Sequence, residues 1–264
     1  MSEIRVNGVR LHYEVHGSGE PILCIHGTGS STALWRRPAA ALAAHGRTIV
    51  YDRRGFGRSE RPEPFVTNVH EQADDAAALL DALDAVPAVV IGRSQGGEIA
   101  VDLTLRYPDR VRALALLEGG GLSLGAALRA WLADAHERLF AAAAADVGAV
   151  GETWFREVLG NDAWDTVPDD VRRVFVDNGR AILAEERGGL LDVDAAQLGT
   201  IARPTLVVGA RASGPGFAEA TELTAAAIPG ARLAWVEGGH LIDPADPVVR
   251  AFVDEVLLST ASRV

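Results

Sequence analysis

The 264-residue sequence contains no lysine: all 25 residues counted as lysine or arginine are arginine. This absence excludes a mechanism that forms a Schiff base on a lysine side chain. Cysteine occurs once, as Cys24 in the apolar run 21–25, so an internal disulfide is excluded as well. A reducing compartment fits the sequence best, and we interpret Cys24 as a small apolar residue of a buried strand.

Membrane-spanning and nucleic-acid-binding segments are missing too. No apolar run approaches the length that spans a bilayer, and the first residues lack the basic start and apolar segment of a secretory signal. The formal net charge of −11 opposes binding to nucleic-acid phosphates. We expect a cytoplasmic protein that acts on a small molecule, with no nucleic acid and no membrane as partner; a homodimer is left open.

Motifs for metals and cofactors are also absent from the sequence. No cluster of histidines, cysteines and carboxylates has the spacing of metal ligands. The pair Gly55-x-Gly57 lacks the third glycine and the flanking pattern of a dinucleotide-binding loop. We therefore expect an activity that needs neither metal nor cofactor.

Short apolar runs alternate with helical patterns in both terminal parts of the chain. The first two runs predict a hairpin that turns at Asn7-Gly8. Strands that alternate with helices favour a parallel sheet covered on both faces. We predict an α/β fold with a mostly parallel eight-stranded sheet and flanking helices. The predicted strands are 4–6, 10–15, 21–25, 48–51, 88–91, 111–117, 204–208 and 232–236, and the predicted helices include 35–44, 71–85, 126–147, 154–158, 171–186 and 247–258.

This alternation stops after the glycine run 119–121. Residues 122–198 contain only helical patterns, and the strand pattern resumes at residue 204. We predict a helical cap, inserted after the sixth strand, that covers the site and is not an independent domain. The α/β core then comprises residues 1–121 and 199–264, and the cap comprises residues 122–198.

One motif carries the strongest chemical signal. The sequence Gly92-Arg93-Ser94-Gln95-Gly96-Gly97 follows the β-branched run 88–91 and precedes a helical pattern. In this strand–Gly-x-Ser-x-Gly–helix context, a serine lies on a sharp turn that exposes its hydroxyl. Side chains at Gly92 and Gly96 would clash where the chain reverses. The turn also points the backbone N–H of Gln95 toward the serine hydroxyl, which is the beginning of an acyl-transfer site.

Three further motifs accompany it in a fixed order. They are His26–Gly29 after the third strand, Asp52–Ser59 after the fourth, and Gly238-Gly239-His240 after the last. With 92–97, they make the chain resemble the α/β-hydrolase fold family over nearly its whole length. The resemblance implies Ser94 as nucleophile, His240 as general base, and the backbone N–H groups of Thr28 and Gln95 as oxyanion donors.

The acid of the catalytic triad departs from the common family pattern. Most members carry it a few residues after the strand that corresponds to 206–208, where this chain reads Gly209-Ala210-Arg211-Ala212-Ser213-Gly214-Pro215 without a carboxylate. Glu118, at the end of the preceding core strand, occupies a second family position. The haloalkane dehalogenases and the serine-dependent fungal zearalenone lactonases resemble the chain in this placement. Alternative acids are Glu219, Asp243 and Glu237.

Aromatic residues of the cap and of the loop after the third strand are candidates for the substrate pocket. We select Trp131, Trp154 and Trp35, together with Gly27, whose missing side chain leaves room for a substrate oxygen. Core packing is an equally good interpretation for Trp35, and some cap aromatics must seal the cap onto the core. The cap aromatics are Trp131, Phe140, Trp154, Phe155, Trp164 and Phe175.

These features together predict an enzyme. Serine needs a base within hydrogen-bond reach to become nucleophilic, and a carboxylate fixes the tautomer of that base. We expect a serine hydrolase that cleaves a carboxylic ester or lactone of a small, largely apolar substrate through an acyl-enzyme. Carbon–carbon bond hydrolysis is an alternative, and so is a non-hydrolytic ligand-binding or biosynthetic member of the same fold. An acyltransferase is a weaker third interpretation.

Overall fold

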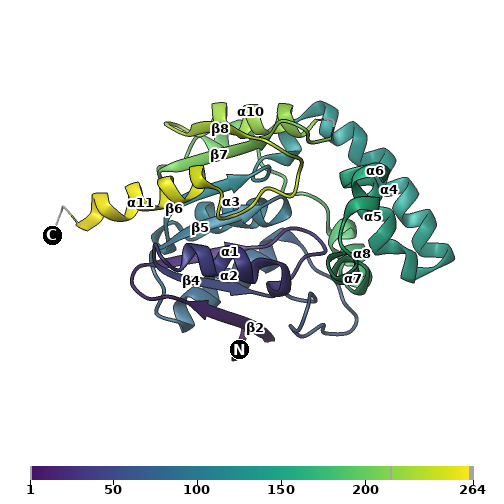
Figure 1. Cartoon of the computed structure of the whole chain (residues 1–264), viewed down its shortest axis with the longest axis horizontal. Helices are drawn as coiled ribbons and strands as arrows, with labels where there is room; N and C mark the ends of the chain where they lie inside the picture. The colour runs from purple at the N-terminus through teal and green to yellow at the C-terminus, as the bar shows by residue number, and fades with distance from the viewer. Residues whose placement is uncertain (1, 215, 262–264) are drawn as a thin grey trace.

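A single sheet organises the molecule, and the computed structural model describes residues 2–214 and 216–261 (Figure 1). Its eight strands lie in the order β1-β2-β4-β3-β5-β6-β7-β8. β1 pairs antiparallel with β2 and β2 with β4, whereas the other pairs are parallel, so the predicted mostly parallel sheet is confirmed. The strands are β1 (Ser2–Val6), β2 (Val9–His16), β3 (Pro21–Ile25), β4 (Arg47–Tyr51), β5 (Ala88–Arg93), β6 (Val111–Leu117), β7 (Thr205–Ala210) and β8 (Arg232–Val236).

The first hairpin turns at the predicted dipeptide. Asn7 and Gly8 both adopt positive φ, at 44° and 75°, and Val6 pairs with Val9 across the turn. A two-residue turn with two positive φ angles matches the right-handed twist of the flanking strands. Asparagine and glycine tolerate this conformation best, which explains why the sequence identifies the turn.

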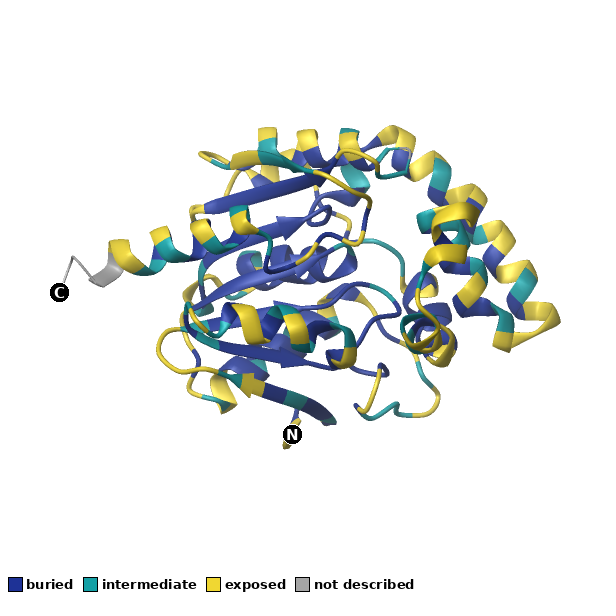
Figure 2. Cartoon of the chain, viewed as in Figure 1, coloured by how far each residue is buried: buried dark blue, intermediate teal, exposed yellow. Residues whose placement is uncertain are grey.

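Helices cover both faces of the sheet. Alternate residues of β5 illustrate this, because Val89 and Ile91 pack with α1 and α11 while Val90 packs with α2 and α3. The strands β3 to β7 are therefore almost continuously buried, as Figure 2 shows. The helices of this core are α1 (Thr32–Leu42), α2 (Val69–Ala82), α3 (Gln95–Arg106), α9 (Ala195–Leu198), α10 (Phe217–Ala227) and α11 (Pro247–Ala261), with the short 3₁₀ turn η1 (Pro108–Arg110).

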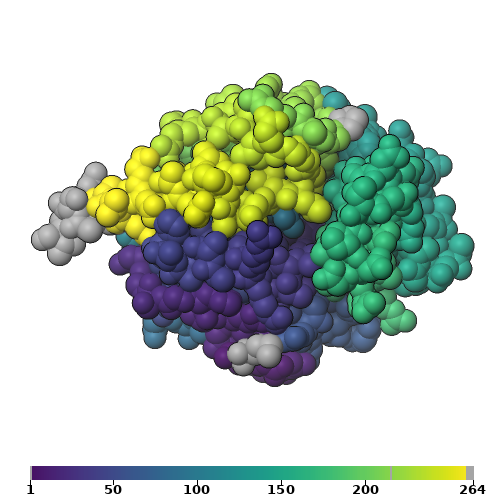
Figure 3. Space-filling model, viewed as in Figure 1, coloured from purple at the N-terminus to yellow at the C-terminus, as the bar shows by residue number. Residues whose placement is uncertain are grey.

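A third layer of helices lies beyond the carboxyl ends of the parallel strands, at the right of Figure 1. The segment between β6 and β7 forms it, and no strand occurs there. Figure 3 shows this cap as a teal and green lobe against the core. Its elements are η2 (Leu122–Leu124), α4 (Ala126–Ala145), η3 (Val147–Ala149), α5 (Val150–Leu159), α6 (Asn161–Thr166), α7 (Asp169–Asp177) and α8 (Gly179–Gly188).

The cap differs from the sequence expectation in two details. The single helix expected over 171–186 is divided into α7 and α8 at Asn178, whose side-chain amide donates to the Gly29 carbonyl oxygen at 2.9 Å. The chain also returns to the core earlier than residue 198. Leu191, Val193 and Leu198 are buried in the cluster beneath the sheet, so α8 is the last helix of the cap.

Buried polar contacts fasten the cap to the core. Arg53, in the loop after β4, forms an ion pair with Glu185 of α8, and both side chains are almost wholly buried. Gln72 of α2 donates to the same carboxylate at 3.0 Å. Removing one member of a buried ion pair strands the other charge, which costs about 3–5 kcal/mol. This network therefore fixes the position of α8 above the sheet.

A second buried carboxyl, that of Glu98 on α3, lies where the cap chain leaves and rejoins the core. Its Oε2 accepts a hydrogen bond from the backbone N–H of Leu191 at 3.0 Å. Burial raises the pKa of Glu98 to about 8, and the backbone N–H groups of Leu191 and Leu122 oppose that rise. Glu98 thus interacts with both ends of the inserted segment.

No helix among the described residues has the length and apolar character needed to cross a membrane.

Candidate active site

Ser94 lies between the end of β5 and the start of α3. Its φ of 53° and ψ of −125° are a strained conformation for a residue with a side chain. The flanking glycines are required by space: a Cβ on Gly92 would lie 2.3 Å from the carbonyl oxygen of Gly96, and one on Gly96 would lie 2.2 Å from that of Ile25. Such contacts are prohibitive, so the tight turn that exposes the Ser94 hydroxyl demands glycine at both positions.

Glu118 and His240 meet beside this turn. Glu118 follows β6 directly, and His240 lies on the loop after β8. The distance from His240 Nδ1 to Glu118 Oε2 is 2.8 Å, and both side chains are buried. The contact leaves the Nε2 side of the imidazole for other interactions. This is the arrangement in which a carboxylate fixes a tautomer with a basic Nε2.

Two further donors hold the Glu118 carboxylate. The backbone N–H of Ala210 donates to Oε1 at 2.8 Å, and the Ser213 hydroxyl donates to Oε2 at 2.6 Å. Both donors belong to the end of β7 and the loop after it, the segment that lacks a carboxylate. Sequence reasoning searched this segment only for an acid and missed Ser213. The signal that could have identified Ser213 is a hydroxyl residue in the loop where most family members carry the acid.

The alternative acids are engaged elsewhere. Glu219 accepts a hydrogen bond from the backbone N–H of Ala127 at 2.9 Å, at the start of α4. Asp243 accepts one from its near neighbour Ala245 at 2.8 Å. Glu237 forms an ion pair with an arginine, and its side chain is 89% exposed. Glu118 is the carboxylate whose contact with His240 the structure shows.

Two residues whose backbone N–H groups could stabilise an oxyanion share the pocket with Ser94. Thr28 and Gln95 line the same pocket as Ser94, and within the described residues neither backbone N–H donates to another protein atom. The loop after β3 passes close to Ser94 at Gly27, where a Cβ would lie 3.2 Å from the Ser94 Cβ. Two unused N–H groups beside a nucleophile are the geometry that stabilises a developing oxyanion.

His26 supports the loop that carries Thr28. Its Nδ1 donates to the Gly27 carbonyl oxygen at 2.8 Å, and its Nε2 accepts from the backbone N–H of Arg53 at 3.1 Å. Burial, together with the charge of Arg53, holds the pKa of His26 well below its usual range. The ring is therefore neutral, and its two hydrogen bonds hold the loop that follows β3.

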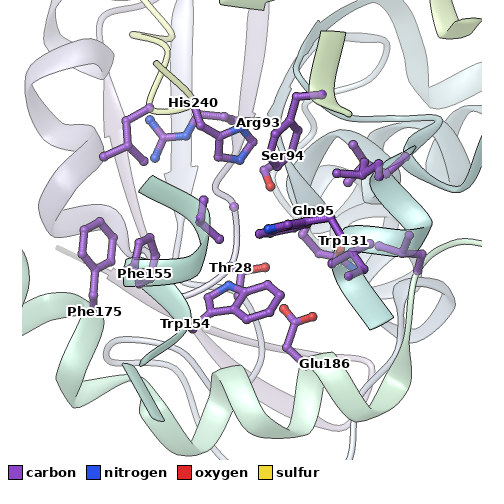
Figure 4. A pocket seen from close by; sticks show the side chains of 18 residues that line it. Thr28, Arg93, Ser94, Gln95, Trp131, Trp154, Phe155, Phe175, Glu186 and His240 are labelled. Carbon is purple, nitrogen blue, oxygen red and sulfur yellow. The ribbon is translucent and has the colours of Figure 1, made fainter. Parts of the chain in front are cut away.

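The pocket above Ser94 is enclosed by the cap (Figure 4). Gly27, Trp131 and Trp154 line it as expected, and Phe155 and Phe175 join them. Most of the lining is apolar. The remaining lining residues are Thr28, Arg93, Ser94, Gln95, Leu122, Leu128, Leu132, Val158, Glu186, Leu190, Phe217, His240 and Leu241.

Trp35 does not belong to the pocket, which corrects its selection from the sequence. It lies on α1 with 1% of its surface exposed, within the apolar cluster between the sheet, α1 and α11. The Arg93 guanidinium lies over its ring at 5.3 Å from the ring centre. The direction of α1 buries this side chain between α1 and the sheet, so core packing, the alternative interpretation, describes Trp35.

Over residues 2–214 and 216–261, no three or more histidine, cysteine and carboxylate side chains come together in a group that could hold a metal ion.

Comparison with known proteins places this architecture. The family model described as alpha/beta hydrolase fold matches residues 20–242. The chain belongs to the α/β-hydrolase fold family. The eight-stranded sheet and its flanking helices are the family's fold, and Ser94, Glu118 and His240 lie at the carboxyl ends of its strands.

Several relatives within the family are similar to the chain. The putative carbamate hydrolase RutD of Variovorax paradoxus is 35% identical over 217 residues, or 76% of this chain and 77% of that protein. The 2-hydroxymuconate semialdehyde hydrolase of Pseudomonas sp. (strain CF600) is 40% identical over 124 residues, 46% of this chain. The match to this relative spans only 44% of the relative's length.

A solved structure extends the likeness to the whole chain. The enol-lactonase from Burkholderia xenovorans LB400 superposes with a TM-score of 0.78, covering 98% of this chain and 100% of that one. The two sequences are 24% identical, so the superposition speaks for the fold alone. It shows that the cap and core together have a counterpart in a solved hydrolase structure.

The Ser213 hydroxyl yields a first prediction. In Ser213→Ala, Glu118 loses one donor but keeps the Ala210 N–H, so the His240 ring is held less firmly. We expect kcat to fall roughly tenfold with KM little changed, the effect of losing about one charge-assisted hydrogen bond. Steady-state kinetics of both variants on the same substrate measures this. Ser123→Ala is the control, since Ser123 donates to the Val193 carbonyl and does not line the pocket; equal kinetics for both variants would contradict the assignment.

Proposed function

We propose that the protein is a serine hydrolase that cleaves a carboxylic ester or lactone of a small, largely apolar substrate through an acyl-enzyme. The observation that supports this most is the 2.8 Å contact between His240 Nδ1 and Glu118 Oε2, next to a strained serine in one pocket. Three residues from separate strand ends converge there. Structural packing alone does not require this convergence of a nucleophile, a base and an acid.

The geometry supports a two-stage reaction. Ser94 attacks the substrate carbonyl while His240 Nε2 takes its proton, and Glu118 stabilises the imidazolium that forms. The N–H groups of Thr28 and Gln95 receive the oxyanion. His240 then returns the proton to the leaving alcohol, and a water molecule, deprotonated by His240, releases the acid from Ser94. In a lactone the leaving alcohol stays attached to the acyl group, so one hydroxy acid is the product.

The acid position supports a closer assignment within the family. Glu118 after β6, with a serine nucleophile, gives an arrangement like that of the zearalenone lactonases. The apolar cap wall of Trp131, Trp154 and Phe155 suits the hydrocarbon part of such an ester or lactone.

Carbon–carbon bond hydrolysis is the second candidate. A relative named 2-hydroxymuconate semialdehyde hydrolase shares 40% identity over 46% of the chain. The same serine, histidine and oxyanion donors serve both reactions. Which substrate is cleaved therefore depends on which one fits the pocket. A non-hydrolytic ligand-binding member is the remaining alternative.

A covalent probe separates these proposals. We expect a fluorophosphonate to label Ser94 stoichiometrically, as intact-protein and peptide mass spectrometry would show, and Ser94→Ala to remain unlabelled. Turnover is then compared for aliphatic esters, aryl esters, macrolactones and a vinylogous 1,5-diketone, with Ser94→Ala as the blank. Labelling with ester or lactone turnover supports the proposal. Turnover of the diketone alone supports carbon–carbon hydrolysis, and ligand binding without labelling or turnover supports the non-hydrolytic alternative.

A further inference from the structure

One carboxyl group interrupts the apolar wall of the pocket. Glu186 lies on α8 of the cap, is 9% exposed, and lines the pocket among leucine, tryptophan and phenylalanine side chains. In Figure 4 its carboxyl group points into the pocket from the cap side, whereas Ser94 and His240 lie on the opposite side. A leucine here would continue the apolar wall, so the buried carboxyl needs an explanation.

The two oxygens of Glu186 have different surroundings. Oε2 contacts His136 Nε2 of α4 at 2.9 Å. Within the described residues, Glu186 Oε1 has no hydrogen-bond partner. It is not among the fully buried polar atoms, and Glu186 lines the pocket. Half of the hydrogen-bonding capacity of this carboxyl is therefore left for a molecule in the pocket.

Aromatic packing holds the pair in place. The His136 ring stacks on Trp154 with centroids 5.8 Å apart and 15° between the planes, and on Phe140 at 5.5 Å and 22°. A histidine fixed between two rings fixes the carboxyl that it contacts. Trp154 also lines the pocket, so the Glu186–His136 pair is built into the wall and is not a surface ion pair.

The proposed reaction does not use this pair. Glu118 already orients His240, and Thr28 and Gln95 already provide two oxyanion donors. Figure 4 places Gln95 and Thr28 between Ser94 and Glu186. A substrate held at Ser94 would thus present its far end, not its reacting carbonyl, to Glu186.

We propose that Glu186 is a specificity-determining residue that accepts a hydrogen bond from a hydroxyl or amino group on the part of the substrate remote from the scissile carbonyl. This inference rests on the proposed function, and it narrows the substrate to an apolar ester or lactone with a distal donor. A site built to accept a hydrogen bond discriminates strongly against an analogue without the donor, because the buried carboxyl is then left unpaired.

The same carboxyl opposes anionic substrates. A carboxylate brought to this part of the pocket would meet a like charge in a low-dielectric setting. Since a 2-hydroxymuconate semialdehyde carries a carboxylate, Glu186 favours ester or lactone hydrolysis over the second candidate function wherever that carboxylate would lie against the cap.

The charge of Glu186 depends on its neighbours. Burial raises its pKa to about 7; His136 and Arg53 lower it, and Glu185 raises it further. Glu98 of α3, whose pKa burial raises to about 8, also interacts with it. The carboxylate, a stronger acceptor than the acid, forms as the pH rises through about 7. Preference for the donor-bearing substrate should therefore increase between pH 6 and pH 8.5.

Matched ligand pairs test the inference apart from catalysis. Methyl 6-hydroxyhexanoate is compared with methyl heptanoate, and 6-hydroxyhexyl acetate with heptyl acetate, so that a hydroxyl replaces a methyl at the far end of either the acyl or the alcohol part. Dissociation constants are measured by calorimetry in Ser94→Ala, with and without Glu186→Leu. We expect the hydroxyl compound of one pair to bind roughly 10–100-fold more tightly, and Glu186→Leu to abolish that preference.

Two further variants complete the design. Glu186→Gln keeps the size and an acceptor oxygen, so it should retain part of the preference but lose its increase with pH. Glu152→Gln on α5 removes a carboxylate from the cap surface, where it pairs with Arg156, and should leave the preference unchanged. Equal binding within both pairs, or no detectable binding of any of the four compounds, would overturn the inference. Failure of the wild-type protein to hydrolyse any ester or lactone of the panel would instead overturn the proposed function, because the binding measurement does not depend on turnover.

Discussion

Replacing Ser94 by alanine is expected to lower kcat by at least roughly 10⁴-fold while the protein remains folded. In the proposed mechanism this side chain forms the covalent bond to the acyl carbon, and alanine offers no atom to replace it. The proposed oxyanion donors, the backbone N–H groups of Thr28 and Gln95, are not altered by this substitution. Enzymes of this type that lose the nucleophile retain only the catalysis that the oxyanion site and substrate binding supply.

The measurement is steady-state hydrolysis of the best ester or lactone from the substrate panel. Ser259→Ala on α11 is the matched control, since its hydroxyl donates to the Val256 carbonyl and does not line the pocket. Thermal unfolding of both variants shows whether the fold is kept. A Ser94→Ala protein with turnover within tenfold of the wild type would refute the nucleophile assignment, and with it the proposed function.

Replacing Glu118 by glutamine is the second large effect, with an expected loss of roughly 10³–10⁴-fold in kcat. The amide is nearly isosteric with the carboxylate, so packing is preserved. If the glutamine NH₂ group faces His240, it meets the hydrogen on Nδ1, which requires an acceptor. Alternatively, the imidazole takes the tautomer with its hydrogen on Nε2, and Nε2 is then no longer basic. Stabilisation of the imidazolium is lost in either case. Binding of substrate, and hence KM, should change little.

Glu219→Gln provides the decisive comparison. Glu219 follows the strand after which most family members carry the acid, yet its carboxylate caps the start of α4 at Ala127. We expect kcat to stay within about twofold of the wild type. The free energy of unfolding should fall by roughly 1 kcal/mol, because the hydrogen bond to the first turn of α4 is weakened. If Glu219→Gln proved the more damaging of the two substitutions, the acid would have to be reassigned.

Local sequence was sufficient to predict the nucleophile turn and the sheet. The glycines around Ser94 are dictated by contacts within the motif and with β3, and alternating apolar runs identify the strands whatever the rest of the chain does. Glu118 could be selected because a strand end and a missing carboxylate in the usual place are both visible in the sequence. The contact with His240 itself depends on how β6 and β8 lie in the sheet.

Features that arise from docking of the cap could not be predicted in this way. Glu186 and His136 are fifty residues apart and become neighbours only because α8 packs against α4. The division between α7 and α8 at Asn178 likewise follows from a hydrogen bond to the loop after β3. Trp35 shows the same limit on a smaller scale: an aromatic residue after the oxyanion loop suits the pocket or the core, and only the direction of α1 decides between them.

The Glu98 carboxyl has a consequence for protein engineering. Its Oε2 accepts a hydrogen bond from the backbone N–H of Leu191, near the end of the inserted segment, and the backbone N–H of Leu122, near the start, lowers its pKa, so both junctions lie near this buried carboxyl. A chimaera that exchanges the residues between Leu122 and Leu191 for another family member's lid would therefore meet the same two splice points. Glu98 marks where such a transplant should begin and end.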